Sequence, residues 1–209
     1  MCPVHLVFGD IDNNAGYPFI KRVKLIETFR EICLSNKPKL NSHSFFDVDN
    51  DSIMIGLSGL EDFLSGNDVL KYVQNLYWKL KKNNINVSFG VNLIACQSEI
   101  DRSTCPGILD DIRRIYMPDT EFNATGSVLR PILVGNPLIV VAQILEIAKE
   151  TKNPICFALA NGKHPNNYFD REMIIRPIIG WHKMISHEHA SLLKENGIQD
   201  VYCLDVTSK

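Results

Sequence analysis

The sequence predicts an α/β (α+β) fold whose core is a ferredoxin-like βαββαβ unit, with helices packed on a mainly antiparallel sheet. Two strand-like regions, residues 4–10 and 44–59, each bring an apolar run up to a cluster of carboxylates. Residues 19–33 and 67–82 repeat apolar side chains at helical spacing. The resulting order of strand, helix, hairpin and helix matches the first part of a βαββαβ unit.

The first strand is expected over residues 4–10, which are apolar enough to lie in the centre of a sheet. Asn13 and Gly16 then interrupt the strand, because both residue types favour turns. Pro18 suits the first turn of a helix, where its missing N–H is not needed. We therefore expect a helix over residues 19–33.

Residues 44–59 are predicted to form a hairpin with an acidic turn. Asn67 or Asp68 caps the next helix, which ends near Lys82 in a lysine-rich turn that complements the helix dipole. A long alternating strand over residues 85–95 completes the βαββαβ order.

The second half of the chain is less regular. We expect a helix over residues 108–116, a strand over 128–134, a helix from 135–137 through 149, and strands over 154–160 and 201–206. Together these elements predict a single domain over residues 1–209, with a core of about residues 4–160 and a C-terminal extension, residues 161–209, that completes the sheet.

Composition narrows the partners and the compartment. A net charge of −2 provides no basic patch for DNA or RNA, so no nucleic acid is expected as a partner. The six cysteines include no Cys-x-x-Cys pair. The amino terminus lacks the features of a signal peptide, and the apolar runs fall short of the roughly 18 residues of a membrane span. We expect a cytoplasmic protein that does not bind membranes.

The two acidic clusters are the best candidates for a functional site. The first strand runs into Asp10 and Asp12, and the hairpin turn carries Asp47, Asp49 and Asp51. Carboxylates at about 4 Å repel by about 1 kcal/mol per pair in water and by about 4 kcal/mol in a partly screened site. If the two clusters lie side by side, a divalent cation with oxygen ligands is the natural compensation, and Mg²⁺ or Mn²⁺ fits best.

Each cluster also has a purely structural explanation. Asp, Asn and Ser are ordinary turn formers, and Asp12 can be a helix cap. A calcium loop starting at Asp47 is excluded, because Ser52 stands where that loop needs glycine and Ser58 where it needs glutamate. In a βαββαβ unit, however, the first strand lies beside the central hairpin, so that the two clusters would converge. A helix starting near Gly16 would then offer backbone amides to a phosphate.

Several short motifs resemble the palm-type nucleotidyl cyclases, which include class III adenylate and guanylate cyclases and diguanylate cyclases. The motifs are Phe8-Gly9-Asp10-Ile11, Asp10-Ile11-Asp12-Asn13, the turn Asn50-Asp51-Ser52, the strand Val87-Ser88-Phe89-Gly90-Val91 and the segment from Arg130 to Pro137. The last of these looks most like the class III pattern. Divergent members of this kind make pyrimidine cyclic nucleotides in anti-phage signalling, and the resemblance extends to them.

The resemblance implies roles for individual residues. Asp10 and Asp51 would ligate two Mg²⁺ or Mn²⁺ ions together with the Ile11 carbonyl. Asp12, Asp47 and Asp49 are either further ligands or neighbours. The phosphates of a nucleoside triphosphate would rest on the backbone amides of Asn13, Asn14, Ala15 and Gly16. The reaction would make a cyclic nucleotide and release pyrophosphate. Class III sites form between two subunits, so a homodimer is implied.

Several positions depart from the class III pattern. The Gly and the aromatic residue that follow the first Asp motif in the family are Asn13 and Asn14 here, and Asp47 stands in place of a lysine. The family places an Asn and an Arg where this chain has Ile139 and Gln143. Arg130 or Lys149 could replace the missing arginine, whose charge stabilises the transferred phosphate. Two functions therefore remain open. One is a nucleotidyl cyclase with a divergent site; the other is a catalytically inactive palm domain that binds nucleotide or a partner protein as a sensor or regulatory subunit.

Overall fold

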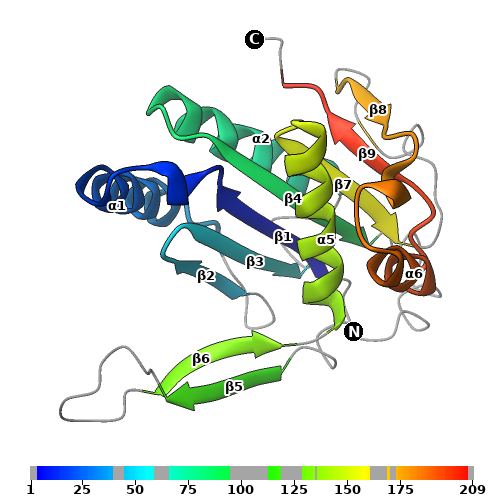
Figure 1. Cartoon of the computed structure of the whole chain (residues 1–209), viewed down its shortest axis with the longest axis horizontal. Coiled ribbons are helices and arrows are strands. Elements are labelled where there is room, and N and C mark those ends of the chain that lie inside the picture. The colour runs from blue at the N-terminus through cyan, green and yellow to red at the C-terminus, as the bar shows by residue number, and fades with distance from the viewer. Residues whose placement is uncertain are drawn as a thin grey trace.

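The computed structural model describes residues 4–39, 45–58, 66–94, 113–118, 129–134, 136–160, 169 and 173–206. A seven-stranded sheet dominates these residues, in the order β2-β3-β1-β4-β7-β9-β8 (Figure 1). Its strands are β1 (Val4–Ile11), β2 (Phe45–Asp49), β3 (Ser52–Ser58), β4 (Val87–Ile94), β7 (Ile155–Ala160), β8 (Ile175–Pro177) and β9 (Val201–Leu204). All neighbouring strands are antiparallel except β4 and β7. The predicted fold class is confirmed.

The remaining described elements are helices and a separate hairpin. The helices are α1 (Phe19–Ser35), α2 (Gly66–Lys82), α5 (Asn136–Thr151) and α6 (His187–Glu195), with short 3-10 turns η1 (Asn14–Gly16) and η3 (Trp181–Lys183). Strands β5 (Arg113–Pro118) and β6 (Leu129–Val134) pair with each other in a two-stranded sheet. None of the helices in these parts of the chain is both long and apolar enough to cross a membrane.

The two faces of the central sheet are covered by different helices. Alternate residues of β1 point to opposite faces. Val7 and Ile11 belong to the core cluster shared with α1 and α2, whereas Leu6 packs against Leu138 and Val141 of α5. Figure 1 shows α5 crossing in front of the sheet and α2 behind it. Asp10 has the same parity as Leu6, so its side chain lies on the α5 face.

One sequence prediction is wrong. A helix was expected over residues 108–116, but residues 113–116 belong to strand β5. The segment Arg113–Pro118 pairs residue by residue with Leu129–Val134, so its backbone hydrogen bonds are made to another strand. A short apolar run of this kind fits either element by periodicity, and the distant partner decided the outcome.

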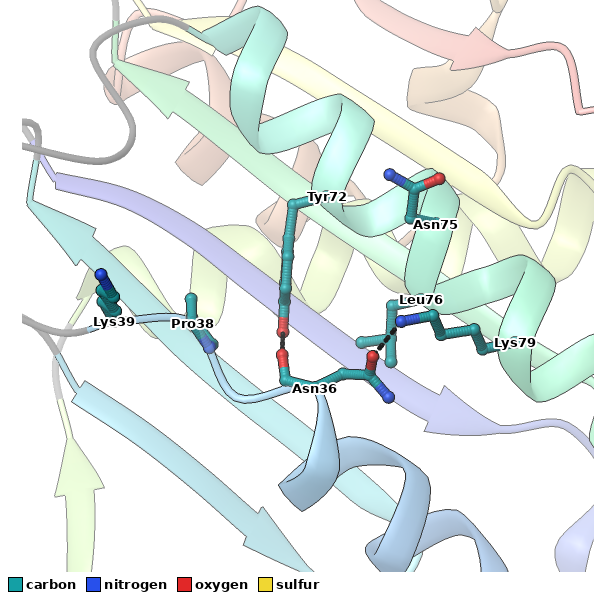
Figure 2. Close-up of a pocket in the computed structure, with 7 residues that line it drawn as sticks. All are labelled: Asn36, Pro38, Lys39, Tyr72, Asn75, Leu76 and Lys79. Carbon is teal, nitrogen blue, oxygen red and sulfur yellow. Dashed lines mark hydrogen bonds between the residues drawn. The ribbon is translucent and has the colours of Figure 1, made fainter.

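Asn36 ties the end of α1 to α2 (Figure 2). Its side-chain amide donates to the Ile32 carbonyl at 2.7 Å and so closes the end of α1. From α2, the Tyr72 hydroxyl donates to the Asn36 backbone carbonyl at 3.2 Å, and the Lys79 ammonium donates to the Asn36 side-chain oxygen. The two helices that cover the same face are therefore joined by polar bonds as well as by apolar packing.

Helix α5 lies unusually close to β4 because Gly90 has no side chain. A Cβ added to Gly90 would stand 2.4 Å from the Leu145 nitrogen and 2.5 Å from the Val141 oxygen, both backbone atoms of α5. Backbone atoms of a packed helix cannot move aside as the end of a flexible side chain can. Gly90 thus fixes the height of α5 above the sheet.

We expect Gly90→Ala to lower the free energy of unfolding by about 1–3 kcal/mol, because the added methyl group overpacks the interface with α5. The measurement is urea denaturation of the purified chain. Gly16→Ala is the matched control, since a Cβ at Gly16 meets nothing within 4 Å. Equal stability of the two variants would contradict the close approach of α5.

His5 is a buried titratable group in the middle of the core. Its side chain is 3 % exposed, and burial lowers its pKa to about 4 from the ordinary 6.5, with the Asp68 carboxylate opposing the shift. The folded state consequently holds His5 neutral at neutral pH, while the unfolded chain takes up a proton near pH 6.5.

Between pH 6.5 and 4 the unfolded state binds more protons at His5 than the folded state, so stability falls as the pH falls through this window. The loss attributable to His5 is at most about 3 kcal/mol. We expect the pH profile of unfolding free energy to be flatter in His5→Gln than in the wild type. A His5→Gln profile parallel to the wild type would refute the assignment.

Candidate functional site

The end of β1 and the turn of the β2–β3 hairpin lie side by side. Asp10 pairs with Ser52 in the ladder between β1 and β3, and with Ser88 in the ladder between β1 and β4. The Ile11 amide donates to the Asp51 backbone carbonyl at 3.0 Å. The two acidic clusters, which are far apart in the chain, are therefore neighbours across a strand pair.

These residues open into one cavity of about 680 Å³ on the α5 side of β1. We call it the acidic cavity. Its lining residues are Asp10, Ile11, Asp12, Asn13, Asn14, Ala15, Asp51, Ser88, Lys149, Lys152 and Pro154. Three carboxylates and two ammonium groups thus share one opening.

Two asparagines shape the turns around the acidic cavity. Asn50, in the hairpin turn, and Asn13, before η1, have φ angles of 45° and 55°, in the left-handed region that asparagine tolerates better than most residues. The Ser52 hydroxyl donates to the Asp49 carbonyl at 3.1 Å and closes the hairpin turn. The Gly16 amide donates to the Asn13 carbonyl at 3.0 Å and closes the loop after β1.

Each of the three carboxylates has one specific partner. The Lys149 ammonium donates to Asp10 Oδ2 at 2.6 Å, the Asn14 side-chain amide donates to Asp51 Oδ2 at 2.7 Å, and the Ser88 hydroxyl donates to Asp12 Oδ1 at 2.8 Å. These partners come from α5, η1 and β4, so three elements hold the carboxylates in place.

The electrostatics of the cavity are dominated by Asp10 and Lys149. Burial raises the pKa of Asp10, the charges of Asp51 and Asp12 act in the same direction, and the Lys149 ammonium opposes them. Burial alone would lower the pKa of Lys149, but the hydrogen bond to Asp10 and the nearby carboxylates outweigh it and raise that pKa. Lys149 therefore stays protonated and balances a carboxylate that burial disfavours.

The donor set fits a hard cation that is shared with a substrate. No group of three His, Cys, Asp or Glu side chains in the described residues is arranged to hold a metal by itself. Asp10 and Asp51 nevertheless lie together, and the oxygen Oδ1 of the buried Asn14 beside them has no hydrogen-bond partner. Mg²⁺ is commonly held by one or two carboxylates together with substrate phosphates, and this arrangement offers such a set.

Most of the predicted site residues meet in the acidic cavity. Asp10, Ile11, Asp12, Asn13, Asn14, Ala15 and Asp51 line it. Gly16, Asp49 and Gln143 are not among the lining residues, although Gly16 and Asp49 adjoin it in the chain. Strand β6 carries Arg130 in its backbone pairing with Met117, but the Arg130 side chain lies outside the described residues.

Sequence reasoning missed three lining residues, Ser88, Lys152 and Pro154. Ser88 lies in the motif noted for β4, but only strand pairing shows that its hydroxyl reaches Asp12. Lys152 and Pro154 follow the end of α5. No sequence motif in this segment indicates a functional site. Lys149 was a candidate for replacing a missing arginine, and its bond to Asp10 could not be predicted.

A second cavity, of about 410 Å³, lies on the other side of the sheet and has a different character (Figure 2). It is lined by Asn36, Pro38, Lys39, Tyr72, Asn75, Leu76 and Lys79. The lining residues in the described part of the chain include no carboxylate.

Several solved structures of cyclases are similar to this chain. The chain is similar to a bacterial light-regulated adenylyl cyclase at 12 % identity and a TM-score of 0.57, with 99 % of this chain and 52 % of that chain covered. A second such structure gives the same TM-score at 11 % identity. A dimeric guanylyl cyclase domain of the RhoGC fusion protein from the aquatic fungus Blastocladiella emersonii covers 98 % of this chain and 96 % of its own at 10 % identity and a TM-score of 0.49.

The two likenesses to light-regulated adenylyl cyclase structures show that this chain shares their fold, at sequence identities too low to show more. The chain spans about half the length of the adenylyl cyclase chains that it matches. No protein-family model and no curated protein sequence matches it.

We expect Asn14→Asp to destabilise the fold by about 1–3 kcal/mol at pH 7, because it replaces a donor to Asp51 with a second carboxylate. Lowering the pH towards 5 should reduce this penalty, since the two carboxylates can then share a proton. The measurement is chemical denaturation at both pH values. Asn75→Asp, on the exposed face of α2, is the control; a penalty for Asn14→Asp that does not depend on pH would argue against contact with Asp51.

Proposed function

We propose that this protein is a metal-dependent nucleotidyl cyclase, which converts a nucleoside triphosphate into a cyclic nucleotide and pyrophosphate. The observation that carries the proposal is the convergence of Asp10 and Asp51 in one cavity, at the end of a central strand of a cyclase-type fold. Either acidic cluster alone could be an ordinary turn. The fact that both clusters line one cavity favours a functional site.

In this proposal Asp10, Asp51 and the Ile11 carbonyl hold Mg²⁺ or Mn²⁺. A divalent cation bound there supplies charge neutralisation for the triphosphate and lowers the pKa of a coordinated hydroxyl group. The Asn14 amide keeps Asp51 oriented through its 2.7 Å bond, and Ser88 does the same for Asp12 at 2.8 Å. Asp12 is then a neighbour that adds negative charge near the cation.

The loop after β1 is suited to hold phosphate. The backbone hydrogen bonds of the described residues include none from the amides of Asn13, Asn14 or Ala15, whereas the Gly16 amide is used within the loop. Three amides at the edge of the cavity are therefore available as anion donors. The proposed phosphate-binding amides are therefore those of Asn13, Asn14 and Ala15, without the Gly16 amide that the sequence also indicated.

The reaction is an in-line displacement at the α-phosphorus. The ribose 3′-oxygen forms a bond to the α-phosphorus as the bond from the α-phosphorus to the bridging oxygen breaks. The proton of the hydroxyl leaves to solvent or to a neighbouring carboxylate, and pyrophosphate carries away the bonding electrons. The chain's own part is to position the triphosphate and to concentrate charge around it.

We also propose a homodimer. Gln143, at the position of the class III arginine, does not line the acidic cavity of its own chain. A second copy could bring it there. Phe19, Ile20 and Ile139 are 71 %, 74 % and 43 % exposed, and apolar side chains as exposed as these gain from burial against another subunit.

Two observations favour a second function. In it, the chain is a catalytically inactive palm domain that binds nucleotide as a sensor. The class III arginine is replaced by the uncharged Gln143. In addition, an ammonium group already pairs with Asp10, the central residue of the proposed cation site. The loss of the arginine would reduce turnover more than binding, and the pair with Lys149 would oppose the cation that turnover needs.

We expect purified protein with Mn²⁺ or Mg²⁺ to form cyclic product and pyrophosphate from at least one of the four ribonucleoside triphosphates. Asp51→Asn should reduce the rate by roughly 100-fold or more, as loss of a charge-stabilising group commonly does. Asp47→Asn, at an exposed position of β2, is the control and should be unaffected.

The possible results separate the alternatives. Metal-dependent nucleotide binding without turnover would favour the inactive palm domain. Turnover that survives in both Asp10→Asn and Asp51→Asn would show that the chemistry lies elsewhere.

A further inference from the structure

The Lys149 ammonium occupies one carboxylate oxygen of Asp10, which is a proposed ligand of the cation. Lys149 sits in the last turn of α5, and its ammonium is 2.6 Å from Asp10 Oδ2 and 3.7 Å from Glu146 Oε1. The side chains of Lys149 and Asp10 are 31 % and 23 % exposed, so the pair is partly withdrawn from water. In the described structure the charge of Asp10 is thus balanced by a group of the chain itself.

An ammonium group and a divalent cation cannot share this carboxylate oxygen without strong repulsion. Lysine is suited to give way, because its charge is a compact ammonium on a flexible four-carbon stem. A change of rotamer moves the charge by several ångströms while the backbone of α5 stays fixed by its contact with Gly90. Lys149 is therefore a cation that is tethered to the chain and able to change position by rotation of its side chain.

We infer that Lys149 is a tethered counter-ion that competes with the divalent cation for Asp10 and moves to the substrate phosphates when the cation binds. This inference deepens the proposed function and rests on it. It assigns Lys149 a positioning role that is distinct from direct replacement of an arginine at the position of Gln143.

The charge of the acidic cavity supports the exchange. With all groups ionised, the carboxylates of Asp10, Asp12 and Asp51 and the ammonium groups of Lys149 and Lys152 leave a formal charge of −1. A cation at Asp10 makes the pair with Lys149 unfavourable, and a phosphate arriving with the cation supplies a new anionic partner in the same cavity. Cation binding and phosphate binding would then assist each other.

The test measures Mn²⁺ alone, by electron paramagnetic resonance titration of full-length protein at pH 7 without nucleotide. Lys149→Met should bind Mn²⁺ more tightly than the wild type by up to about fivefold, because partly exposed ion pairs contribute up to about 1 kcal/mol. Lys149→Arg keeps the charge and should stay within about twofold of the wild type.

Matched controls separate competition for Asp10 from a general change in charge. Lys152→Met removes a charge from the same cavity without removing a bond to Asp10, and should tighten Mn²⁺ binding less than Lys149→Met. Lys183→Met removes an exposed charge from η3 and should have no effect. Lys149→Gln repeats the measurement if Lys149→Met does not fold, as judged by circular dichroism.

The inference is overturned if Lys149→Met binds Mn²⁺ no more tightly than the wild type, or if neither protein binds Mn²⁺. It is also overturned if Lys152→Met has the larger effect. Failure of the proposed function would be seen differently, as Mn²⁺ binding with the expected order of affinities but no cyclic product from any triphosphate.

Discussion

The antiparallel pairing of β1 with β3 is the constraint on which the rest of the site depends. It joins the Ile11 amide to the Asp51 carbonyl and sets Asp10 opposite Ser52, so the two acidic clusters share one edge of the sheet. A slip of one residue in this register would turn Asp10 to the face covered by α1 and α2. Apolar residues such as Val7 and Ile55, both 0 % exposed, hold the register, so the core of the protein determines the geometry of its polar cavity.

Much of the fold could be predicted because its local signals agree with its long-range pairing. The apolar strand before Asp10, the hairpin around Asn50 and the periodic helix after Gly66 all form where their patterns indicate. The helix predicted across Arg113 failed because a distant strand, β6, decided the conformation of a short apolar run. Local periodicity carries no information about such a partner.

In the candidate site, too, some residues could be predicted from the sequence and others could not. Asp10, Asp51 and the loop from Asn13 to Ala15 could be predicted, since they stand beside turn and strand signals. Their partners could not. The bonds from Lys149 to Asp10 and from Ser88 to Asp12 join residues on α5 and β4 to the end of β1, and only the packing of those elements brings the atoms within reach. The likeness to cyclase structures extends to the fold, while the roles of these residues rest on the chemistry of the cavity.

The absence of a side chain at Gly90 also affects Lys149, which lies one helical turn beyond the Leu145 backbone that approaches Gly90. Because the backbone of α5 rests directly on β4 at Val141 and Leu145, the next turn of the helix lies close enough to the sheet for Lys149 to contact the Asp10 carboxylate. A bulkier residue at position 90 would move α5 away from the sheet. The Lys149 ammonium would then lie farther from Asp10. Gly90 on β4 thereby determines how closely the ammonium of Lys149 approaches Asp10.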